Sequence, residues 1–341
     1  MYGYDQAHGS PHEHMGGQAE QPMDGPAADG HRLGQSRAQR DEHARGMIQK
    51  PWGWVIIDKK SGVTSMHVTH RIKRIFNMKK AGHAGTLDPL ASGILPVALG
   101  LATPLIAYAM NFSKTYTFTV AWGAFTATDD LLGVIQQTCE KRPTLMQLQE
   151  ILPRWIGEIS QVPPVYCAAK IQGMPAYTRA RQGENVCLAA RRVHIHHMEI
   201  LDHRGDESDF RMTCGTGTYV RSVARDMATV LGMCGFIKAL RRVRVGPFHE
   251  GMCLGQLEQS NPDEIRGILL PPQQVLGGMQ SYQVSQSEKM ALWDGKKIQL
   301  SLLTPLTQNV IACYDESGCL VALANVCQGW LAPTRCFIGT I

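Results

Sequence analysis

The sequence predicts an α+β protein built on a mixed, mostly antiparallel sheet with flanking helices. Apolar and polar residues alternate in a strand-like pattern at Tyr116–Trp122 and again at Phe210–Cys214. Two other segments, Leu145–Ile156 and Tyr219–Leu231, place apolar residues at helical spacing. Strands and helices do not alternate regularly along the chain, so a parallel sheet of strand–helix–strand units is not expected.

Residues 1–46 have a composition that predicts a disordered tail. They are rich in Gly, His, Gln, Ala and Asp and contain almost no large apolar side chains. Such a stretch cannot bury enough surface to offset the entropy that is lost on ordering. A metal site at His8, His12 and His14 is a weaker alternative, and Met47 begins the first segment that looks folded.

The main domain is expected over residues 47–257. Trp54–Asp58 is a short apolar run closed by charged residues, which predicts a buried strand and turn. Thr64 and Ser65 can cap a helix over His67–Phe76, because their hydroxyls can accept from the first free backbone N–H groups.

The C-terminal part is expected to form a separate, smaller domain. Prolines and glycines gather at residues 258–280, which predicts a linker. Residues 281–341 follow, with strand candidates at Val310–Tyr314 and Leu320–Asn325 around a Ser-Gly turn. The pattern predicts a small β-rich domain appended to the main one.

The overall composition is typical of a soluble globular protein and argues against a membrane protein. Apolar residues make up 44% of the chain and charged residues 18%. No run approaches the roughly 18 apolar residues that span a bilayer, and no secretory signal pattern is present. We therefore expect a cytoplasmic protein. The net charge of +5 is compatible with a nucleic-acid partner but does not require one.

The ten cysteines are scattered singly and contain no CxxC pair. Structural zinc sites usually have ligands paired at short spacing. Reduced thiols are therefore favoured over metal ligands or disulfides, and no metal site is expected.

The segment Gly82–Pro96 is the most unusual part of the chain. It holds three glycines, two prolines, one histidine and one carboxylate, that of Asp88. Glycine permits tight turns, and Pro89 biases Asp88 away from helical geometry. The carboxylate is therefore expected on a loop, where composition alone would make it a turn former.

At this segment the chain resembles the TruB family of tRNA pseudouridine synthases. Residues 82–103, GHAGTLDPLASGILPVALGLAT, are similar to the family signature GHxGTLDPxAxGxLPxxxGxAT. Further blocks resemble family motifs in the same order: DKPxGxTS at Asp58–Ser65, KxY at Lys114–Tyr116, GxxTxTxD at Gly123–Asp130, PPxYSAxK…YxxAReG at Pro163–Gly183, and the blocks at Gly217–Ser222 and Leu240–Phe248.

The resemblance implies the pseudouridine synthase fold and a PUA-like RNA-binding domain over residues 281–341. It also implies isomerisation of uridine 55 in the tRNA T-loop by base flipping, without a metal or organic cofactor. The expected partner is tRNA, bound through its T-loop and T-stem. The chain is expected to act as a monomer without an obligatory protein partner.

Three catalytic residues are carried over from the family. Asp88 is implied as the nucleophile, with attack at C1′ or at C6 of the base both left open. Arg221 is implied to pair with this carboxylate and to keep it ionised. Tyr116 is implied to stack on the flipped uracil and to help remove the C5 proton.

Four further residues are implied to contact substrate or support the site. Tyr219 and Leu240 match residues that line the uracil pocket. His83 matches a histidine placed where the target base leaves its stack. Lys59 matches a lysine near the catalytic loop with a supporting role.

Departures from the family pattern affect phosphate binding more than chemistry. Lys60 replaces a turn-stiffening proline, Cys167 replaces a serine, and Thr216 replaces a lysine that could contact phosphate. The remaining candidates for phosphate contacts are basic side chains on the first helix and in the last block: Arg71, Lys73, Arg74, Arg241 and Arg242.

Two alternatives to a stand-alone synthase stay open. A dyskerin-like synthase, which works inside a guide-RNA particle, would share the catalytic blocks but typically has basic extensions, whereas residues 1–46 are acidic overall. A tRNA-folding chaperone is the other alternative, and it could exist as a second role beside catalysis.

Overall fold

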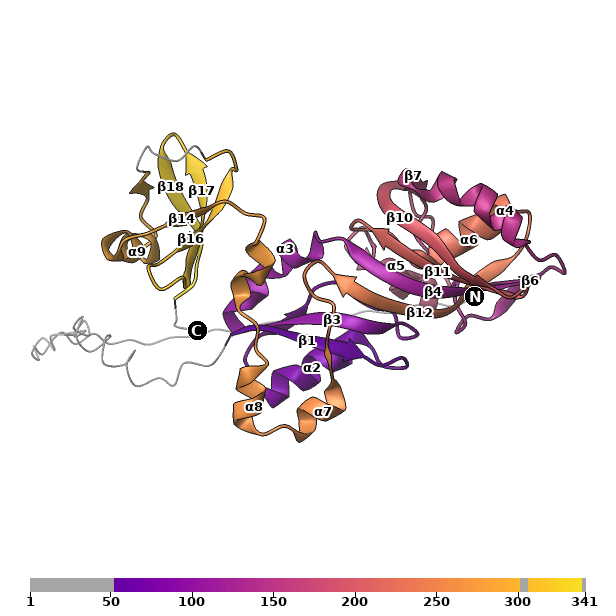
Figure 1. The fold of residues 1–341 in the computed structure, drawn as a ribbon, viewed down its shortest axis with the longest axis horizontal. Coiled ribbons are helices and arrows are strands. Elements are labelled where there is room, and N and C mark those ends of the chain that lie inside the picture. Colours follow the sequence, from indigo (N-terminus) through magenta and orange to yellow (C-terminus); the bar gives the residue numbers. More distant parts are fainter. Residues whose placement is uncertain (1–51, 301–305, 339–341) are drawn as a thin grey trace, which may run out of the picture. The chain divides into compact units, whose positions relative to one another are not determined.

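The computed structural model describes residues 52–300 and 306–338 of the chain (Figure 1). The predicted tail at residues 1–46 lies outside this part and stays a prediction. Within the described residues no helix has the length and hydropathy needed to cross a membrane.

A nine-stranded sheet forms the centre of the described chain. Its strands follow the order β13-β1-β3-β12-β4-β11-β10-β7, and β2 pairs with β3. The bounds are β1 (Gly53–Lys59), β2 (Ala81–His83), β3 (Ser92–Leu99), β4 (Lys114–Trp122), β7 (Gly157–Gln161), β10 (Arg191–His203), β11 (Glu207–Cys214), β12 (Gly235–Val245) and β13 (Met252–Cys253).

Antiparallel pairing dominates this sheet, and the predicted α+β class is confirmed. Parallel pairing occurs between β1 and β13 and between β3 and β12. The second of these pairs matters for function because Arg241 and Arg242 of β12 lie beside Ser92 and Gly93 of β3. The strand that follows the Asp88 loop is therefore joined to a strand about 150 residues later in sequence.

Helices flank this sheet, and some of them begin at a side-chain cap. Their bounds in the main domain are α2 (Ser65–Ile75), α3 (Ile106–Met110), α4 (Leu145–Ile151), α5 (Ala176–Arg181), α6 (Val220–Val230), α7 (Leu254–Gln259) and α8 (Pro262–Gly267). Thr64 caps α2 as predicted, since its hydroxyl accepts from the backbone N–H of His67. The predicted helix at Leu145–Ile156 instead ends at Ile151 and continues as a 3₁₀ turn, because Pro153 cannot donate to the helical ladder.

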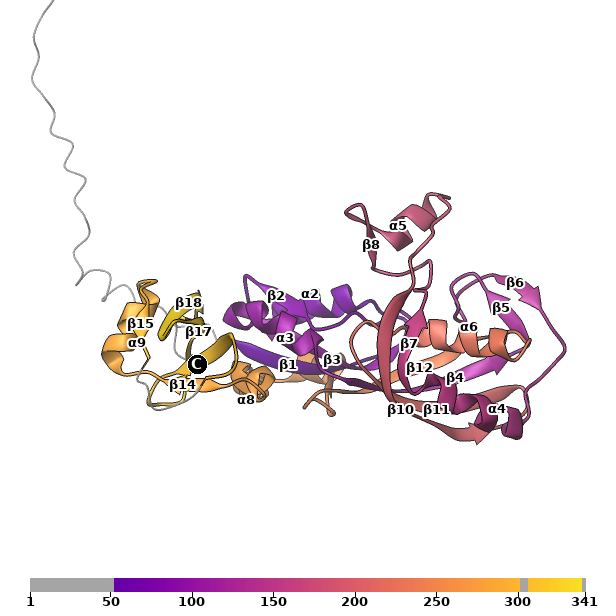
Figure 2. The ribbon, with the colours of Figure 1, turned by 90° about the horizontal axis from the view of Figure 1, so that it is seen from above.

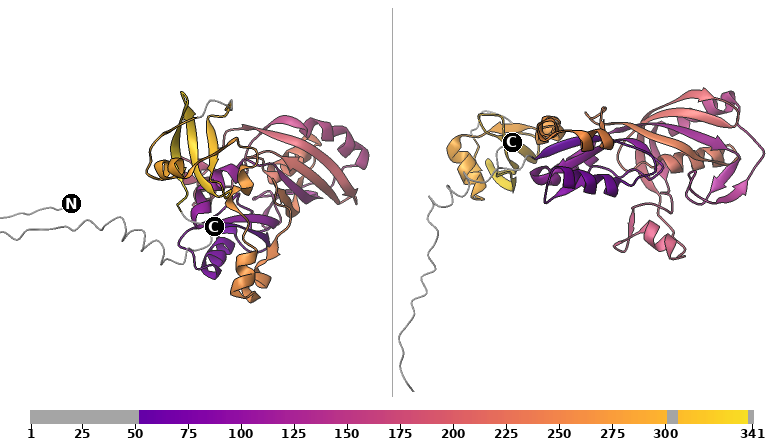
Figure 3. Two further views of the ribbon diagram at one scale, coloured as in Figure 1. Left: turned by 60° about the vertical axis from the view of Figure 1, so that its left-hand side comes forward. Right: turned by 90° about the horizontal axis from the view of Figure 1, so that it is seen from below.

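Two excursions from the sheet carry residues of the site. The hairpin of β5 (Ala124–Thr126) and β6 (Ile135–Thr138) presents residues 128–130 at its turn. The segment with β8 (Lys170–Ile171), β9 (Met174–Pro175) and α5 projects away from the sheet, as Figure 2 shows from above and Figure 3 from below.

The main core lies between the sheet and its helices. Phe118 of β4 and Phe210 of β11 stack with ring centroids 5.3 Å apart. Ile72 of α2 and Met227 of α6 are fully buried against the same cluster. Burying such side chains removes about 1.5–3 kcal/mol of unfavourable hydration each, so this core anchors both helices that flank the site.

The C-terminal part contains a five-stranded sheet of its own, in the order β14-β16-β17-β18-β15. Its elements are β14 (Ser281–Gln283), α9 (Gln286–Trp293), β15 (Ile298–Gln299), β16 (Val310–Tyr314), β17 (Leu320–Cys327) and β18 (Trp330–Cys336). The β-rich appended unit agrees with the fold predicted for this region. Its exact limits stay a prediction.

Residues 258–280, the predicted linker, contain helical segments. These are α8 and a 3₁₀ helix at Pro272–Leu276. Leu270 exchanges backbone hydrogen bonds of 2.8 and 2.9 Å with Trp54 of β1. Prolines and glycines mark helix ends here as well as turns, which is why the composition resembled that of a linker.

Candidate active site

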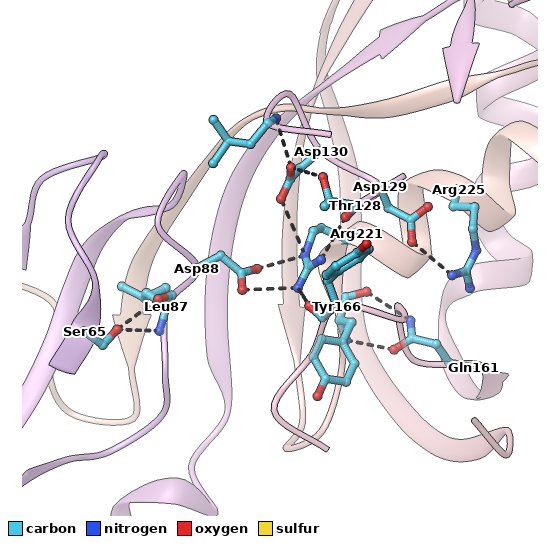
Figure 4. Close-up of polar contacts among 12 residues, drawn as sticks. Ser65, Leu87, Asp88, Thr128, Asp129, Asp130, Gln161, Tyr166, Arg221 and Arg225 are labelled. Atoms are coloured by element: carbon cyan, nitrogen blue, oxygen red, sulfur yellow. Dashed lines mark hydrogen bonds and ion pairs between the residues drawn. The ribbon is translucent and has the colours of Figure 1, made fainter. Parts of the chain in front are cut away.

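The Asp88 loop connects β2 to β3 and is held by side chains from outside it. Ser65, at the start of α2, donates to the carbonyl of Leu87 at 3.0 Å and accepts from its N–H at 2.9 Å (Figure 4). The loop closes on itself where the N–H of Ala91 donates to the carbonyl of Asp88 at 3.1 Å. Hydrogen bonds thus fix the backbone of Leu87 and of Asp88 itself, and the carboxylate projects from this turn.

Arg221 binds the Asp88 carboxylate with two parallel hydrogen bonds. Its Nε lies 2.9 Å from Oδ2 and its Nη2 lies 3.2 Å from Oδ1 (Figure 4). Only 4% of the Arg221 side chain is exposed, against 34% for Asp88. Paired, charge-assisted bonds of this kind fix the orientation of the carboxylate, and part of its surface stays exposed.

The Arg221 guanidinium is itself fixed by the backbone around it. It donates to the carbonyl of Thr128 at 2.8 Å and to that of Tyr166 at 2.9 Å. The buried carboxylate of Asp130 lies 4.0 Å from Nε and accepts from the hydroxyl of Thr128 and from the N–H of Leu132. Arg221 therefore ties the Asp88 loop to the β5–β6 turn and to the segment that precedes β8.

A cavity of about 370 Å³ opens at Asp88. Five of the seven predicted site residues line it: Asp88, Tyr116, Tyr219, Arg221 and Leu240. The other two, Lys59 and His83, are not among its described lining residues. The structure thus assembles residues from Asp88 to Leu240, which are far apart in sequence, around one cavity.

Tyr116 lies in the middle of β4, next to Met212 of β11 and Arg242 of β12. Burial raises the pKa of its hydroxyl, and the nearby Arg242 offsets part of this rise. The phenol is therefore protonated at neutral pH and offers an uncharged ring to the cavity.

Arg242 corrects one of the predictions, since it does not face phosphates. Only 1% of it is exposed. Its Nε donates to the carbonyl of Ile94 at 2.8 Å and its Nη2 to that of Gly85 at 2.9 Å. These two carbonyls lie on either side of Asp88 in sequence, so Arg242 stabilises the backbone of the catalytic loop. Arg241, one position earlier, points the other way and pairs with Asp58.

Two buried lysines add positive charge beside the site. Lys59 donates to the carbonyls of Lys60 and Val63, and Lys114 donates to those of Met110 and Phe112. Burial lowers the pKa of each ammonium to about 8. Asp88 raises the pKa of Lys59 in part, which places this lysine within electrostatic reach of the carboxylate.

His83 links α2 to the catalytic loop. Its Nδ1 lies 3.0 Å from the hydroxyl of Thr69, and its Nε2 lies 3.1 Å from that of Thr86. Burial, with a smaller contribution from Arg242, lowers its pKa. A neutral imidazole is therefore held at the edge of the loop.

Tyr219 is positioned by a residue that the sequence did not indicate. Gln161, at the end of β7, is fully buried, accepts from the N–H of Tyr219 at 2.8 Å and donates to its carbonyl at 3.1 Å. Arg191 of β10 places its guanidinium carbon 4.7 Å from the centre of the Tyr219 ring. Gln161 lies two residues before the recognised block that begins at Pro163, whereas no sequence signal pointed to Arg191.

The described residues contain no cluster of three or more His, Cys, Asp or Glu side chains with the geometry of a metal site. The chemistry assembled here consists of a carboxylate, a guanidinium that pairs with it, and a neutral phenol. Such a set suits nucleophilic attack at an electron-poor carbon beside a stacked ring.

Comparison with known proteins places the chain among synthases. Residues 73–220 match the model of the TruB family pseudouridylate synthase N-terminal domain. The tRNA pseudouridine synthase B of Bradyrhizobium diazoefficiens is 42% identical over 311 residues, which cover 89% of this chain and 90% of that protein. The synthase of the same name from Brucella anthropi is 47% identical over 308 residues, 84% of this chain and 95% of the relative.

Solved structures share the fold. The archaeal box H/ACA sRNP Nop10-Cbf5 complex contains a chain with a TM-score of 0.62 and 25% identity, matched over 84% of this chain and 81% of that one. An H/ACA RNP bound to a substrate RNA containing 2′-deoxyuridine gives a TM-score of 0.64 at 22% identity, over 88% and 87% of the two chains. The second likeness shows the fold alone.

Proposed function

The chain belongs to the TruB family of pseudouridylate synthases, and from this premise we propose that it isomerises uridine 55 in the T-loop of tRNA, with Asp88 as nucleophile. The observation that carries the proposal is the ion pair of Asp88 and Arg221 beside a cavity lined by Tyr116 and Leu240. The relatives named tRNA pseudouridine synthase B support tRNA as the substrate.

The reaction breaks the N1–C1′ bond of uridine, turns the uracil and forms a C5–C1′ bond. The C5 proton is lost and N1 gains a proton, so the product is an isomer of the substrate. A carboxylate can attack and leave again, which gives Asp88 the properties that such a step needs. A carboxylate can attack at C1′ or at C6 of the base.

In this mechanism Arg221 positions the nucleophile. Its two bonds orient the Asp88 carboxylate, and its own position is set by the carbonyls of Thr128 and Tyr166. Little reorganisation is needed when substrate arrives, which is how preorganised polar groups lower a barrier.

The remaining cavity residues would hold the base. A uridine inside a folded loop must leave its stack to reach Asp88. Tyr116 offers its neutral ring for stacking, and Tyr219 and Leu240 complete the wall. His83 stands at the edge of the Asp88 loop, where it could occupy the space that the flipped base vacates. Lys59 would hold the loop and contribute positive potential without touching the base.

The proposed enzyme acts alone and needs no guide RNA. We expect the purified chain to form pseudouridine at position 55 of a T-loop transcript, and a transcript with cytidine at this position to stay unmodified. Conversion only after addition of other proteins would instead favour a dyskerin-like particle. Conversion at another uridine would replace the proposed target site.

Asp88→Asn tests the nucleophile separately from binding. The amide keeps the shape of the side chain but cannot attack, so turnover should be abolished while tRNA affinity stays within about tenfold. Asp206→Asn is the control, because this carboxylate is 79% exposed and lies outside the cavity lining. Measurable pseudouridine from the pure Asp88→Asn protein would exclude Asp88 as nucleophile. A tRNA-folding role would survive in this variant.

A further inference from the structure

Arg191 is a cavity residue that the mechanism above does not use. It is the first residue of β10 and pairs in register with Gln161, the residue that holds the Tyr219 backbone. One of its terminal nitrogens, Nη2, donates to the carbonyl of Gly217, and its guanidinium lies over the Tyr219 ring. The side chain is therefore fixed at two points on one wall of the cavity.

The Nε–H group of Arg191 is buried and has no hydrogen-bond partner among the described residues. No carboxylate of the described chain lies within ion-pair distance of this guanidinium either. Leaving a buried donor unpaired is costly, and the cost is larger for a charged group. A fixed guanidinium with a free donor is consequently suited to a ligand that brings an acceptor and a negative charge.

The other cationic side chains in the described lining are already engaged. Arg221 donates to Asp88, Thr128 and Tyr166, and Arg242 donates to the backbone on both sides of Asp88. The Lys114 ammonium contacts two carbonyls and the hydroxyl of Thr216. Thr216 stands where the family has a lysine, so the wall next to Arg191 lacks a second flexible cation.

We propose that Arg191 is a further substrate-binding residue, whose guanidinium pairs with a phosphate oxygen of a nucleotide flanking the flipped uridine. The inference rests on the proposed function, since it takes the ligand to be an RNA strand. A phosphate is favoured over a uracil carbonyl because the guanidinium lacks a counter-ion and a phosphate supplies one. Its role would be to hold the strand while the base occupies the cavity.

The first measurement compares Arg191→Ala with Arg192→Ala. Both remove one arginine from the start of β10, but the Arg192 side chain is 81% exposed and pairs with Glu158. With a T-loop stem-loop RNA, Arg191→Ala should weaken binding about tenfold and flatten the log–log salt dependence by about 0.7. Arg192→Ala should stay within about twofold of the wild type. Equal effects of the two substitutions would count against a specific contact.

A methylphosphonate scan distinguishes a phosphate contact from mere support of Tyr219. Single neutral methylphosphonates replace the phosphates on either side of the target uridine, and binding is measured with wild type and Arg191→Ala. If Arg191 contacts one of these phosphates, neutralising it should weaken wild-type binding about tenfold and leave the variant almost unchanged. If the loss caused by Arg191→Ala and the loss caused by the methylphosphonate simply add at every position, the proposal is overturned. Arg191 would then act only through the protein.

Two checks keep the result interpretable. Arg191→Met keeps an unbranched side chain as far as the Nε position without a donor or a charge, so the same cycle can be run with it if Arg191→Ala lowers the thermal midpoint. In that case Arg191→Met should show the same loss of methylphosphonate sensitivity, and retained sensitivity would contradict the contact. The cycle measures binding alone, whereas failure of the proposed function would appear as unmodified uridine 55 with the wild type.

Discussion

Asp88 and Arg221 are joined by hydrogen bonds of 2.9 and 3.2 Å although 133 residues separate them in sequence. The same guanidinium holds the carbonyls of Thr128 and Tyr166. One buried side chain thus connects the catalytic loop with two other segments of the main domain. The ion pair supports the fold as well as the site, so its loss should lower both stability and activity.

Arg221→Lys should lower turnover about a hundredfold or more while leaving the salt dependence of tRNA binding nearly unchanged. Lysine keeps the charge but loses the planar fork that orients Asp88. Arg225→Lys is the matched control on the same helix, since Arg225 pairs with Asp129 and does not line the cavity. Single-turnover rates test the loss of turnover, and tRNA binding at several salt concentrations tests the salt dependence. A changed salt slope with a spared rate would make Arg221 a phosphate contact.

Arg74 and Arg242 should respond differently to salt. Arg74 lies on the exposed face of α2, whereas Arg242 is buried against the catalytic loop. If Arg74 contacts phosphate, Arg74→Ala should flatten the log–log slope of binding by about 0.7–0.9. Arg242→Ala should leave the slope unchanged and lower the thermal midpoint, because it frees the carbonyls of Gly85 and Ile94. The opposite pattern would restore Arg242 as an RNA contact.

The stability of the protein should depend on pH through Lys59. Its pKa falls from 10.5 to about 8 on folding, because burial disfavours the ammonium. Between these pH values the unfolded chain binds more protons than the folded one, so stability rises as the pH increases. The free energy of unfolding of wild type minus that of Lys59→Met should therefore increase with pH.

The size of this effect is bounded by about 1.4 kcal/mol per pH unit for one group. Urea unfolding at pH 7.5, 8.5 and 9.5 measures it directly. Lys80→Met removes an exposed lysine, so its free energy of unfolding should change with pH as that of the wild type does. If the free energy of unfolding of Lys59→Met also changes with pH as that of the wild type does, the Lys59 ammonium stays charged over this pH range.

Gly93→Ala should be far more damaging than Gly62→Ala. Both glycines have positive φ, of 102° and 90°, so both substitutions carry a backbone cost of about 1–2 kcal/mol. At Gly93 an added Cβ would also lie 2.1 Å from the carbonyl oxygen of Arg242, whereas at Gly62 it meets nothing within 4 Å. We expect a loss of about 3 kcal/mol or more at Gly93. Similar losses at both positions in urea unfolding would show that β3 can shift away from β12.

The sequence by itself determined the fold class, the principal helices and strands, and the loop that carries Asp88. Local signals sufficed for these features. Thr64 caps its helix through a neighbour three residues away, and the motif around Asp88 is contiguous. The approximate place of Tyr116, Arg221 and Leu240 in one cavity followed from the family resemblance rather than from local chemistry.

The tertiary structure alone decided which basic residues face the solvent. Arg241 and Arg242 are adjacent on one strand, so alternation predicts that they point to opposite sides without saying which side is inside. Pairing of β12 beside β3 buries Arg242 and leaves Arg241 with Asp58. Arg191 is a comparable case, because Gly217 and Tyr219, which it contacts, are distant from it in sequence. A sequence records the order of such groups, but burial and hydrogen bonding depend on which strands become neighbours.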